Sequence, residues 1–370
     1  LLAPFPALVL FGLEHPLHIL LTLIFVMLAS EVISAETPDR ARNILLLVVG
    51  PLMTAARYEG LFAVFIVAAL LAIRKKWRLA LGVGVASIIP VVSLGLISIA
   101  HGGWFFPNSL IIKGTWPLGL LGHPPRLIVI SGLVLIIIFL ASQQKRFWQK
   151  DRLLVFIFSC LLLTHIAFAW VGWFYRHEAY LVVLGLLLLG TWFANNFDRQ
   201  KFGLFLILIG FSFSFLLERG VGSINRTVQA TTSIYEQQYQ MAMFLRENYN
   251  TATVAVNDIG AISYFTRIKL LDLAGLGSID VLREKIKQNG VLSARYLADI
   301  AKKKKVSVIM IYPGWFYRQI PASWIKAGEW KALNKSRVLG GETVSFYARD
   351  KKQSSQLKKR LREWETKKYW

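Results

Sequence analysis

The chain has 370 residues, of which 55% are hydrophobic, and its formal net charge at pH 7 is +22. The hydrophobic residues gather into long apolar runs before residue 219, and the part of the chain after it is richer in charge. This pattern excludes a wholly soluble protein and indicates a membrane domain with a soluble extension. The single cysteine, Cys160, excludes an intramolecular disulfide.

Apolar runs of about the length that crosses a bilayer recur before residue 219. They cover about 16–34, 79–100, 127–142, 153–172, 179–194 and 203–218. Basic residues gather in alternate connections, most densely at Arg74–Arg78 and Lys145–Arg152, and short basic connections favour the cytoplasm. We therefore expect the other connections, and the chain after Glu218, to lie outside the cytoplasm.

The apolar stretch from Asn43 to Ile73 is divided by Arg57 and Glu59 into halves that are too short to span a bilayer comfortably. Because both flanks are basic, we expect a helical pair that turns near Arg57–Gly60 on the outer side. Charges at membrane depth are costly unless they face a wet cavity or each other. Arg57 and Glu59 therefore either line a site or neutralise one another.

The segment from His101 to Arg126 is rich in Gly, Pro, Trp and Phe, which is typical of turns and of the lipid headgroup layer. We expect it to lie along the membrane interface, with Asn108 and Lys113 as its polar contacts. A simple aromatic anchor is the alternative, and the length of the segment argues mildly for a function.

After Glu218 the pattern predicts a small α/β domain, so we divide the chain into a multi-spanning domain at 1–218 and an extracytoplasmic domain at 219–370. The elements expected are helices at 223–247 and 291–303, and strands at 253–256, 269–273, 306–311 and 343–347. Asp258 and Asp272 stand at strand ends, where sites in such sheets form. Capping is the commoner role of Asp at such turns, so we favour structural roles for both.

The second domain is itself basic, with Lys302–Lys305 and a tail that begins at Lys351. Such charge first suggests nucleic acid. Beside a bilayer, anionic headgroups or lipid phosphates are the better match, so we expect membrane lipids and no nucleic acid as partners. Solubility without a specific partner carries equal weight.

The outer connections hold groups that suit acid–base chemistry and the binding of a phosphate leaving group. The carboxylates are Glu14, Glu59 and Glu178, and the cations are Arg57, Lys113 and Arg176. Either arginine can donate two parallel hydrogen bonds to a phosphate. Among the histidines only His15 and His18 have a spacing that a metal could use, and Pro16 interrupts it, so we name no metal site.

Four motifs occur in order on the expected outer side: Gly12-Leu13-Glu14-His15, Arg57-Tyr58-Glu59-Gly60, Pro107-Asn108-Ser109 followed by Lys113, and Tyr175-Arg176. In this order they resemble the GT-C class of membrane glycosyltransferases. The nearest likeness is to bacterial enzymes of the arabinofuranosyltransferase and mannosyltransferase type, which use polyprenyl-phosphate sugars. The runs Val254–Ile262 and Leu271–Leu276 are similar to the extracytoplasmic domain of those proteins, so the resemblance covers nearly the whole chain.

The resemblance implies a polytopic α-helical fold with a C-terminal extracytoplasmic α/β domain, in the cell inner (plasma) membrane. It implies transfer of a sugar from a polyprenyl-phosphate donor to a glycan, lipid or protein acceptor, and it leaves a divalent metal requirement open. The site residues that it implies are Glu14 and Glu59 as catalytic carboxylates, with Glu59 also orienting Arg57, and His15, Arg57, Asn108, Lys113, Tyr175 and Arg176 as substrate-binding residues. The class usually carries a catalytic aspartate in its first outer loop, for which this chain begins too late. We therefore expect a fragment that lacks its N-terminal spans and its general base.

Two other classes stay open. A membrane transporter or flippase of a lipid-linked substrate would more often show two symmetric halves, and this sequence shows no such symmetry. A noncatalytic protein that binds lipid or cell-wall polymer would not need Arg57, Glu59 and Arg176 to meet.

Overall fold

The computed structural model describes residues 5–113, 149–169, 175–195, 202–333 and 338–366. The chain divides into two compact units. The first contains Leu1–His101 and Gly114–Asn225, and the second contains Gly102–Lys113 and Arg226–Trp370. The expected spanning run at 127–142 lies outside the described residues.

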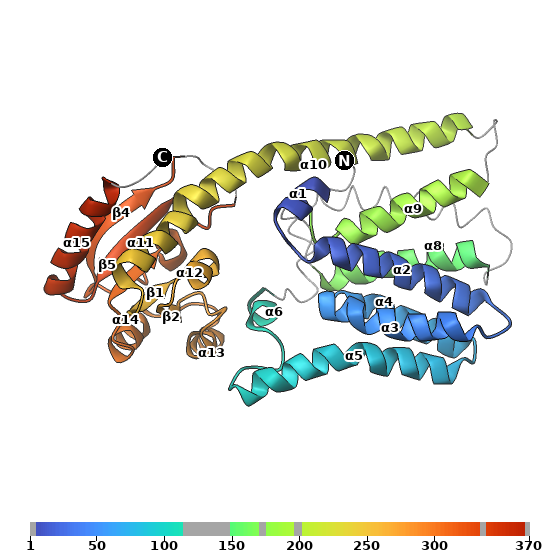
Figure 1. Cartoon of the computed structure of the whole chain (residues 1–370), viewed down its shortest axis with the longest axis horizontal. Coiled ribbons are helices and arrows are strands. Elements are labelled where there is room, and N and C mark those ends of the chain that lie inside the picture. Colours follow the sequence, from blue (N-terminus) through green and yellow to red (C-terminus); the bar gives the residue numbers. More distant parts are fainter. Residues whose placement is uncertain (1–4, 114–148, 170–174, 196–201, 334–337, 367–370) are drawn as a thin grey trace. The chain divides into compact units, whose positions relative to one another are not determined.

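The first unit is a bundle of helices in which α2 has the most neighbours (Figure 1). Its elements are α1 (Phe5–Leu10), α2 (His15–Ser34), α3 (Arg40–Ala56), α4 (Gly60–Ile73), α5 (Trp77–Ala100), α8 (Lys150–Phe168), α9 (Ala179–Asn195) and the first part of α10 (Phe202–Ile234). α2 packs against α1, α3, α4, α8 and α9, and its Phe25 and Val26 share one apolar core with Phe158 of α8. Helices are thus confirmed for the predicted apolar runs that the structure describes.

Three of the described helices, α2, α5 and α8, are long and apolar enough to cross a membrane, and α4 and α9 are shorter apolar helices. On α5 many large apolar side chains stay exposed, including Leu81 at 69% and Ile89 at 55%. A helix that exposes apolar side chains in this way suits a lipid environment. These features indicate that the protein is associated with a membrane.

The stretch from Asn43 to Ile73 forms the predicted helical pair, with Arg57 and Glu59 in the turn between α3 and α4. Gly60 begins α4 at a point where the two helices lie very close. A Cβ at Gly60 would lie 3.0 Å from Cγ and 3.2 Å from the carbonyl carbon of Met53. The tight turn therefore depends on the absence of a side chain at this position.

The residues predicted as a helix at 223–247 are helical throughout, but the helix begins much earlier than expected. The helix predicted at 223–247 is not a separate element, because α10 runs without a break from Phe202 to Ile234. It continues into the π-helix η2 (Tyr235–Tyr239) and α11 (Gln240–Tyr249). No proline occurs between 202 and 249 to stop the helix, so the expected domain boundary near residue 218 falls inside it.

The second unit contains a five-stranded mixed sheet in the order β2-β1-β3-β5-β4. Its strands are β1 (Thr253–Val256), β2 (Lys269–Asp272), β3 (Val308–Ile311), β4 (Ile325–Lys331) and β5 (Thr343–Ala348). β1 pairs in parallel with β2 and β3, whereas β5 pairs antiparallel with β3 and β4. The sequence predicts four of these strands but misses β4, an edge strand in which only Trp330 is buried and in which the register shifts before Gly328.

Helices cover both faces of this sheet. They are α11, α12 (Gly260–Phe265) and α15 (Lys351–Glu365) on one face, and α13 (Ile279–Lys287) and α14 (Ala294–Lys303) on the other. Phe244 of α11 anchors the first layer, with ring centroids 5.5, 5.8 and 5.9 Å from those of Trp330, Phe346 and Trp364. Such edge-to-face contacts add to the burial of apolar area. The α/β class predicted for this part of the chain is confirmed.

Candidate functional site

Arg57 lies at the end of α3, where the backbone leaves the helix in an extended conformation. Its Nε donates to Oε2 of Glu59 at 3.2 Å, and its Nη2 donates to Oε1 of Glu59 at 2.6 Å. Nη1 donates to Oε1 of Glu14. Because the Arg57 side chain is only 12% exposed, it is a largely buried cation held between two carboxylates.

Two histidines complete the contacts of this guanidinium. Nη1 of Arg57 lies 2.6 Å from Nε2 of His15, and Nη2 lies 3.2 Å from Nδ1 of His177. Since arginine only donates, both ring nitrogens accept. A guanidinium has five N–H donors, and these five contacts use all of them. We call Glu14, His15, Arg57, Glu59 and His177 the Arg57 cluster.

Three connections that are far apart in the sequence supply the Arg57 cluster. The α1–α2 connection contributes two members after a turn at Gly12, whose φ of +61° favours glycine. The α3–α4 turn contributes two more. His177 comes from the connection before α9, which contains Tyr175 at φ +56°, an uncommon conformation for a residue with a side chain. Backbone strain of this kind often accompanies functional sites.

The two carboxylates of the cluster are both ionised at neutral pH. Burial raises the pKa of Glu59, but His177 and Arg57 outweigh burial and hold this pKa below its usual range. The pKa of Glu14 is also lowered, because its backbone hydrogen bond and the nearby His15 and Arg57 together exceed the effect of burial. The side chain of Glu14 is 46% exposed and that of Glu59 is 18% exposed. Glu14 is therefore the carboxylate that an incoming molecule can reach.

Arg176 lies beside the Arg57 cluster in a different electrostatic situation. Within the described part of the chain its one hydrogen bond runs from Nε to Nε2 of His177 at 3.4 Å, and no carboxylate pairs with it. His177 already accepts through Nδ1, and a neutral imidazole has one acceptor nitrogen, so the longer contact is weak. Burial, and next the charge of Arg57, lower the pKa of Arg176. Arg176 is therefore a half-buried cation without a counter-ion among these residues.

A second ion pair begins at the next residue of the same connection. Glu178 is 2% exposed and accepts a hydrogen bond from Nη2 of Arg219. The guanidinium carbon of Arg219 lies 4.0 Å from the ring centroid of Tyr175, which is a cation–π contact. Tyr175, expected to bind substrate, thus packs against Arg219. Sequence reasoning misses Arg219 because it stands where the domain boundary is expected, and the charge of Glu178 next to the apolar helix α9 is the signal that could have found it.

Asn108 and Lys113 are the first and last residues of the short helix α6, and both belong to the second unit. Nδ2 of Asn108 donates to the carbonyl of Leu276 at 3.1 Å, in the loop that follows β2. Nη2 of Arg283 donates to the carbonyl of Gly102 at 3.3 Å. The structure therefore places both predicted substrate-binding residues in the same compact unit as the α/β domain, and Asn108 contacts that domain directly.

The two aspartates at the strand ends have structural contacts. Asp272 is fully buried and accepts from the backbone N–H groups of Ala274 and Gly277, both at 2.7 Å. The structural role predicted for Asp272 is confirmed. Asp258 accepts from the hydroxyl of Tyr312 at 2.8 Å, and burial together with this carboxylate raises the pKa of Tyr312.

Two further buried histidines lie in the helical bundle. Nε2 of His18 lies 3.5 Å from Oγ1 of Thr22, and Nδ1 of His165 lies 3.0 Å from the hydroxyl of Tyr180. His165 is fully buried and is thus a hydrogen-bonded core histidine. In the part of the chain that the structure describes, no group of three or more His, Cys, Asp and Glu side chains could hold a metal ion.

Comparison with known proteins identifies a likeness in the second unit alone. A family model described as a domain of unknown function (DUF8728) matches residues 229–347, which run from the end of α10 to β5. No curated protein and no solved structure matches the chain. The match therefore falls on the α/β domain and does not extend into the helical bundle.

Proposed function

We propose that this protein is a membrane glycosyltransferase that moves a sugar from a polyprenyl-phosphate donor to a cell-envelope acceptor outside the cytoplasm. The observation that carries the proposal is the Arg57 cluster, in which carboxylates, imidazoles and a cation from three separated connections meet at one end of an apolar bundle. The motifs that supply these residues are among those through which the sequence resembles the GT-C class. A lipid-linked donor suits such a site, because its chain can lie in the bilayer while its phosphate reaches the polar end.

Arg176 is the residue that we assign to the donor phosphate. It is half-buried, and it has no carboxylate partner among the described residues. A guanidinium can hold a phosphate through two parallel hydrogen bonds. Such contacts would also stabilise the negative charge that the phosphate gains as the sugar departs.

Arg57 has a positioning role in this proposal. All five of its donors are used within the cluster, so it would have to release a partner before it could bind phosphate. It holds Glu14 and Glu59 in fixed geometry, and Glu59 in turn orients Arg57. Glu14, the more exposed carboxylate, contacts the sugar or the acceptor hydroxyl.

A noncatalytic membrane protein is the second candidate. The full use of the Arg57 donors supports this candidate, because a purely structural ion-pair network also leaves no donor free to bind a substrate. The two candidates differ at Glu14: a structural carboxylate matters for stability alone, whereas a carboxylate that contacts substrate matters for turnover as well.

Sugar transfer tests the proposal. Membranes that contain the protein, with any sequence that precedes Leu1 retained, are given synthetic short-chain polyprenyl-phosphate pentoses and hexoses together with cell-envelope acceptor. We expect transfer by the wild type, a strong loss in Glu14→Gln, and no change in Arg295→Lys, whose side chain is 93% exposed on α14. Absence of transfer from every donor by the wild type, or full activity of Glu14→Gln, would contradict the proposal.

A further inference from the structure

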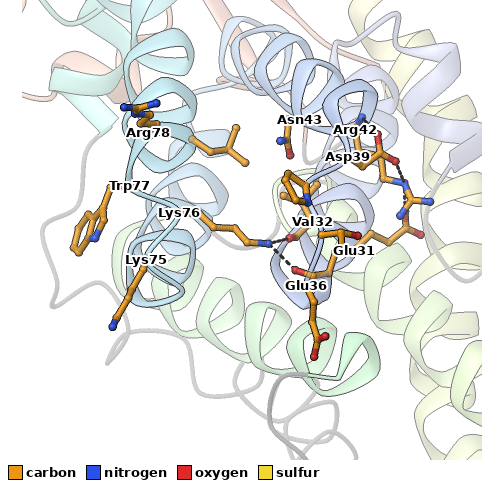
Figure 2. Close-up of a pocket in the computed structure, with 14 residues that line it drawn as sticks. Glu31, Val32, Glu36, Asp39, Arg42, Asn43, Lys75, Lys76, Trp77 and Arg78 are labelled. Atoms are coloured by element: carbon orange, nitrogen blue, oxygen red, sulfur yellow. Dashed lines mark hydrogen bonds and ion pairs between the residues drawn. The ribbon is translucent and has the colours of Figure 1, made fainter.

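A pocket of about 550 Å³ lies at the end of the bundle where α2 ends and α5 begins (Figure 2). One wall is the α2–α3 connection, and the other is the turn between α4 and α5. Glu14 and His15 of the Arg57 cluster lie at the N-terminal end of α2, whereas the pocket lies at its C-terminal end. The pocket is therefore separate from the cluster.

The α4–α5 turn divides its basic side chains into two sets. In the inner set, Nε of Arg74 donates to the carbonyl of Ile33 at 3.2 Å. Nζ of Lys76 donates to the carbonyls of Val32 at 2.5 Å and Ala35 at 2.8 Å, as Figure 2 shows. The last carbonyls of a helix have no partner within it, so these contacts cap α2. The inner set is therefore explained by the fold.

The outer set consists of Lys75, Trp77 and Arg78. In Figure 2 these side chains project from the turn away from the α2–α3 connection, and all three residues are exposed, Trp77 at 64%. Neither the Lys75 nor the Arg78 side chain has a hydrogen bond or an ion pair with any residue that the structure describes. The outer set is therefore an aromatic ring between two unused cations.

The acidic residues of the opposite wall do not neutralise this set. Glu31 lies 2.5 Å from Nζ of Lys150 and 3.7 Å from Nε of Arg42, which also lies 3.2 Å from Asp39. Within the described ranges Glu36 is the one carboxylate of the pocket without an ion pair. The lining residues of the pocket thus include two cations and one carboxylate that have no ion pair, and this balance favours an anion.

Lys75 occupies a backbone position that favours glycine. It follows the end of α4 with φ +58°. The residue after a helix commonly adopts this left-handed conformation, and it is usually glycine, because a side chain makes the conformation costlier. Glycine fits this backbone position with less strain, so the turn can accept Lys75→Gly.

An apolar stripe continues from the outer set along α5. Leu81, Val85 and Ile88 are 69%, 52% and 48% exposed. Their spacing from Trp77, by four, four and three residues, places them on one face of the helix. α5 is also one of the three helices that are long and apolar enough to cross a membrane. The two cations and the tryptophan therefore stand at the end of a lipid-facing stripe, where headgroups lie.

We propose that Lys75, Trp77 and Arg78 bind the phosphate headgroup of an anionic phospholipid, whose acyl chains lie along the exposed stripe of α5. Lysine and arginine match the phosphate, and tryptophan suits the boundary between headgroup and hydrocarbon. The site binds lipid whether or not the protein transfers sugars, so its test is independent of the transferase assay.

The test uses the full chain in nanodiscs of phosphatidylcholine alone and in nanodiscs that also contain phosphatidylglycerol. We expect phosphatidylglycerol to raise the thermal midpoint of the wild type, because it binds the folded state. The double variant Lys75→Gly, Arg78→Gln should lose this rise, since each cation near a charged surface is worth about fivefold in affinity, roughly 25-fold for two. Because glycine suits the backbone at position 75, the midpoint in phosphatidylcholine should not fall, which separates lost lipid binding from misfolding.

The matched control is Lys287→Gln, Arg295→Gln, which removes the same charge from exposed positions of α13 and α14 and should keep the full effect of phosphatidylglycerol. Inorganic phosphate added to phosphatidylcholine discs should not reproduce that effect. The proposal is overturned if the wild type melts alike in both discs, if the Lys75, Arg78 variant responds like the wild type, or if the control loses as much. If the double variant does not fold, the single variant Lys75→Gly is measured in the same two nanodiscs, and we expect it to bind phosphatidylglycerol about fivefold more weakly than the wild type.

Discussion

Glu59 accepts two hydrogen bonds from Arg57, from Nε at 3.2 Å and from Nη2 at 2.6 Å, although a single residue separates them in the sequence. This pair closes the α3–α4 turn on itself. The two charges of the pair cancel. Glu14 and His15, at the start of α2, both contact Nη1 of the Arg57 guanidinium. Paired charges of this kind are the form in which ionised side chains persist near a bilayer.

Replacing Arg57 with lysine should destabilise the helical bundle. An ammonium group has three donors and cannot bind Glu59 with two parallel hydrogen bonds, so several acceptors of the cluster lose their partner. Breaking a fully buried pair costs about 3–5 kcal/mol, and this pair is slightly exposed, so we expect about 2–3 kcal/mol. Chemical unfolding of the purified protein in detergent measures this change. A loss no larger than that of Arg295→Lys would show that the cluster does not stabilise the fold.

The stability that Glu59 provides should depend on pH in one direction. Its pKa is lowered from an ordinary value of 4.5, so the folded protein gains stability from the carboxylate above that value and loses it as the pH falls through the folded pKa. The difference in unfolding free energy between the wild type and Glu59→Gln should be constant above about pH 5 and shrink below about pH 4. A pH series of unfolding curves on both proteins measures it. A difference that grows as the pH falls would mean that the pKa is raised instead.

The pair of Glu178 and Arg219 should matter for folding. Glu178→Gln leaves the guanidinium of Arg219, whose side chain is 14% exposed, without its carboxylate. We expect a loss of about 3 kcal/mol, as for other buried pairs with one partner removed. The double variant Glu178→Gln, Arg219→Met should recover part of this loss, because no buried charge is left unpaired. Equal unfolding midpoints for the wild type and Glu178→Gln would remove the structural role.

Local patterns in the sequence account for most of the elements. The turn at Arg57 and Glu59 is predictable because two charges interrupt an apolar stretch whose halves cannot span separately. Strands β1, β2, β3 and β5 are predictable because they are buried runs rich in branched and other apolar residues. β4 is not, since an edge strand with one buried residue has no such signal.

The partners of Arg57 are less predictable. Glu59 is a near neighbour in the chain, but His15 and His177 lie 42 and 120 residues away from Arg57, and packing alone brings them together. The same holds for Glu178 and Arg219, which are 41 residues apart. Sequence reasoning identifies charged residues on the expected outer side. It cannot show that Arg57 uses all its donors within the cluster, or that Arg176 has no carboxylate partner among the described residues.

Arg176 decides between a structural network and a phosphate site. With the sequence before Leu1 retained, Arg176→Lys and Arg295→Lys are compared with the wild type in two readouts, sugar transfer from a short-chain polyprenyl-phosphate donor and the thermal midpoint. Losing one charged hydrogen bond of about 1.5–3 kcal/mol should lower the transfer rate by roughly ten- to a hundredfold. The midpoint of Arg176→Lys should equal that of the wild type, because Arg176 has no carboxylate partner in the described structure. Near-normal transfer by Arg176→Lys, or a loss of transfer matched by an equal loss of stability, would contradict its role at the donor phosphate.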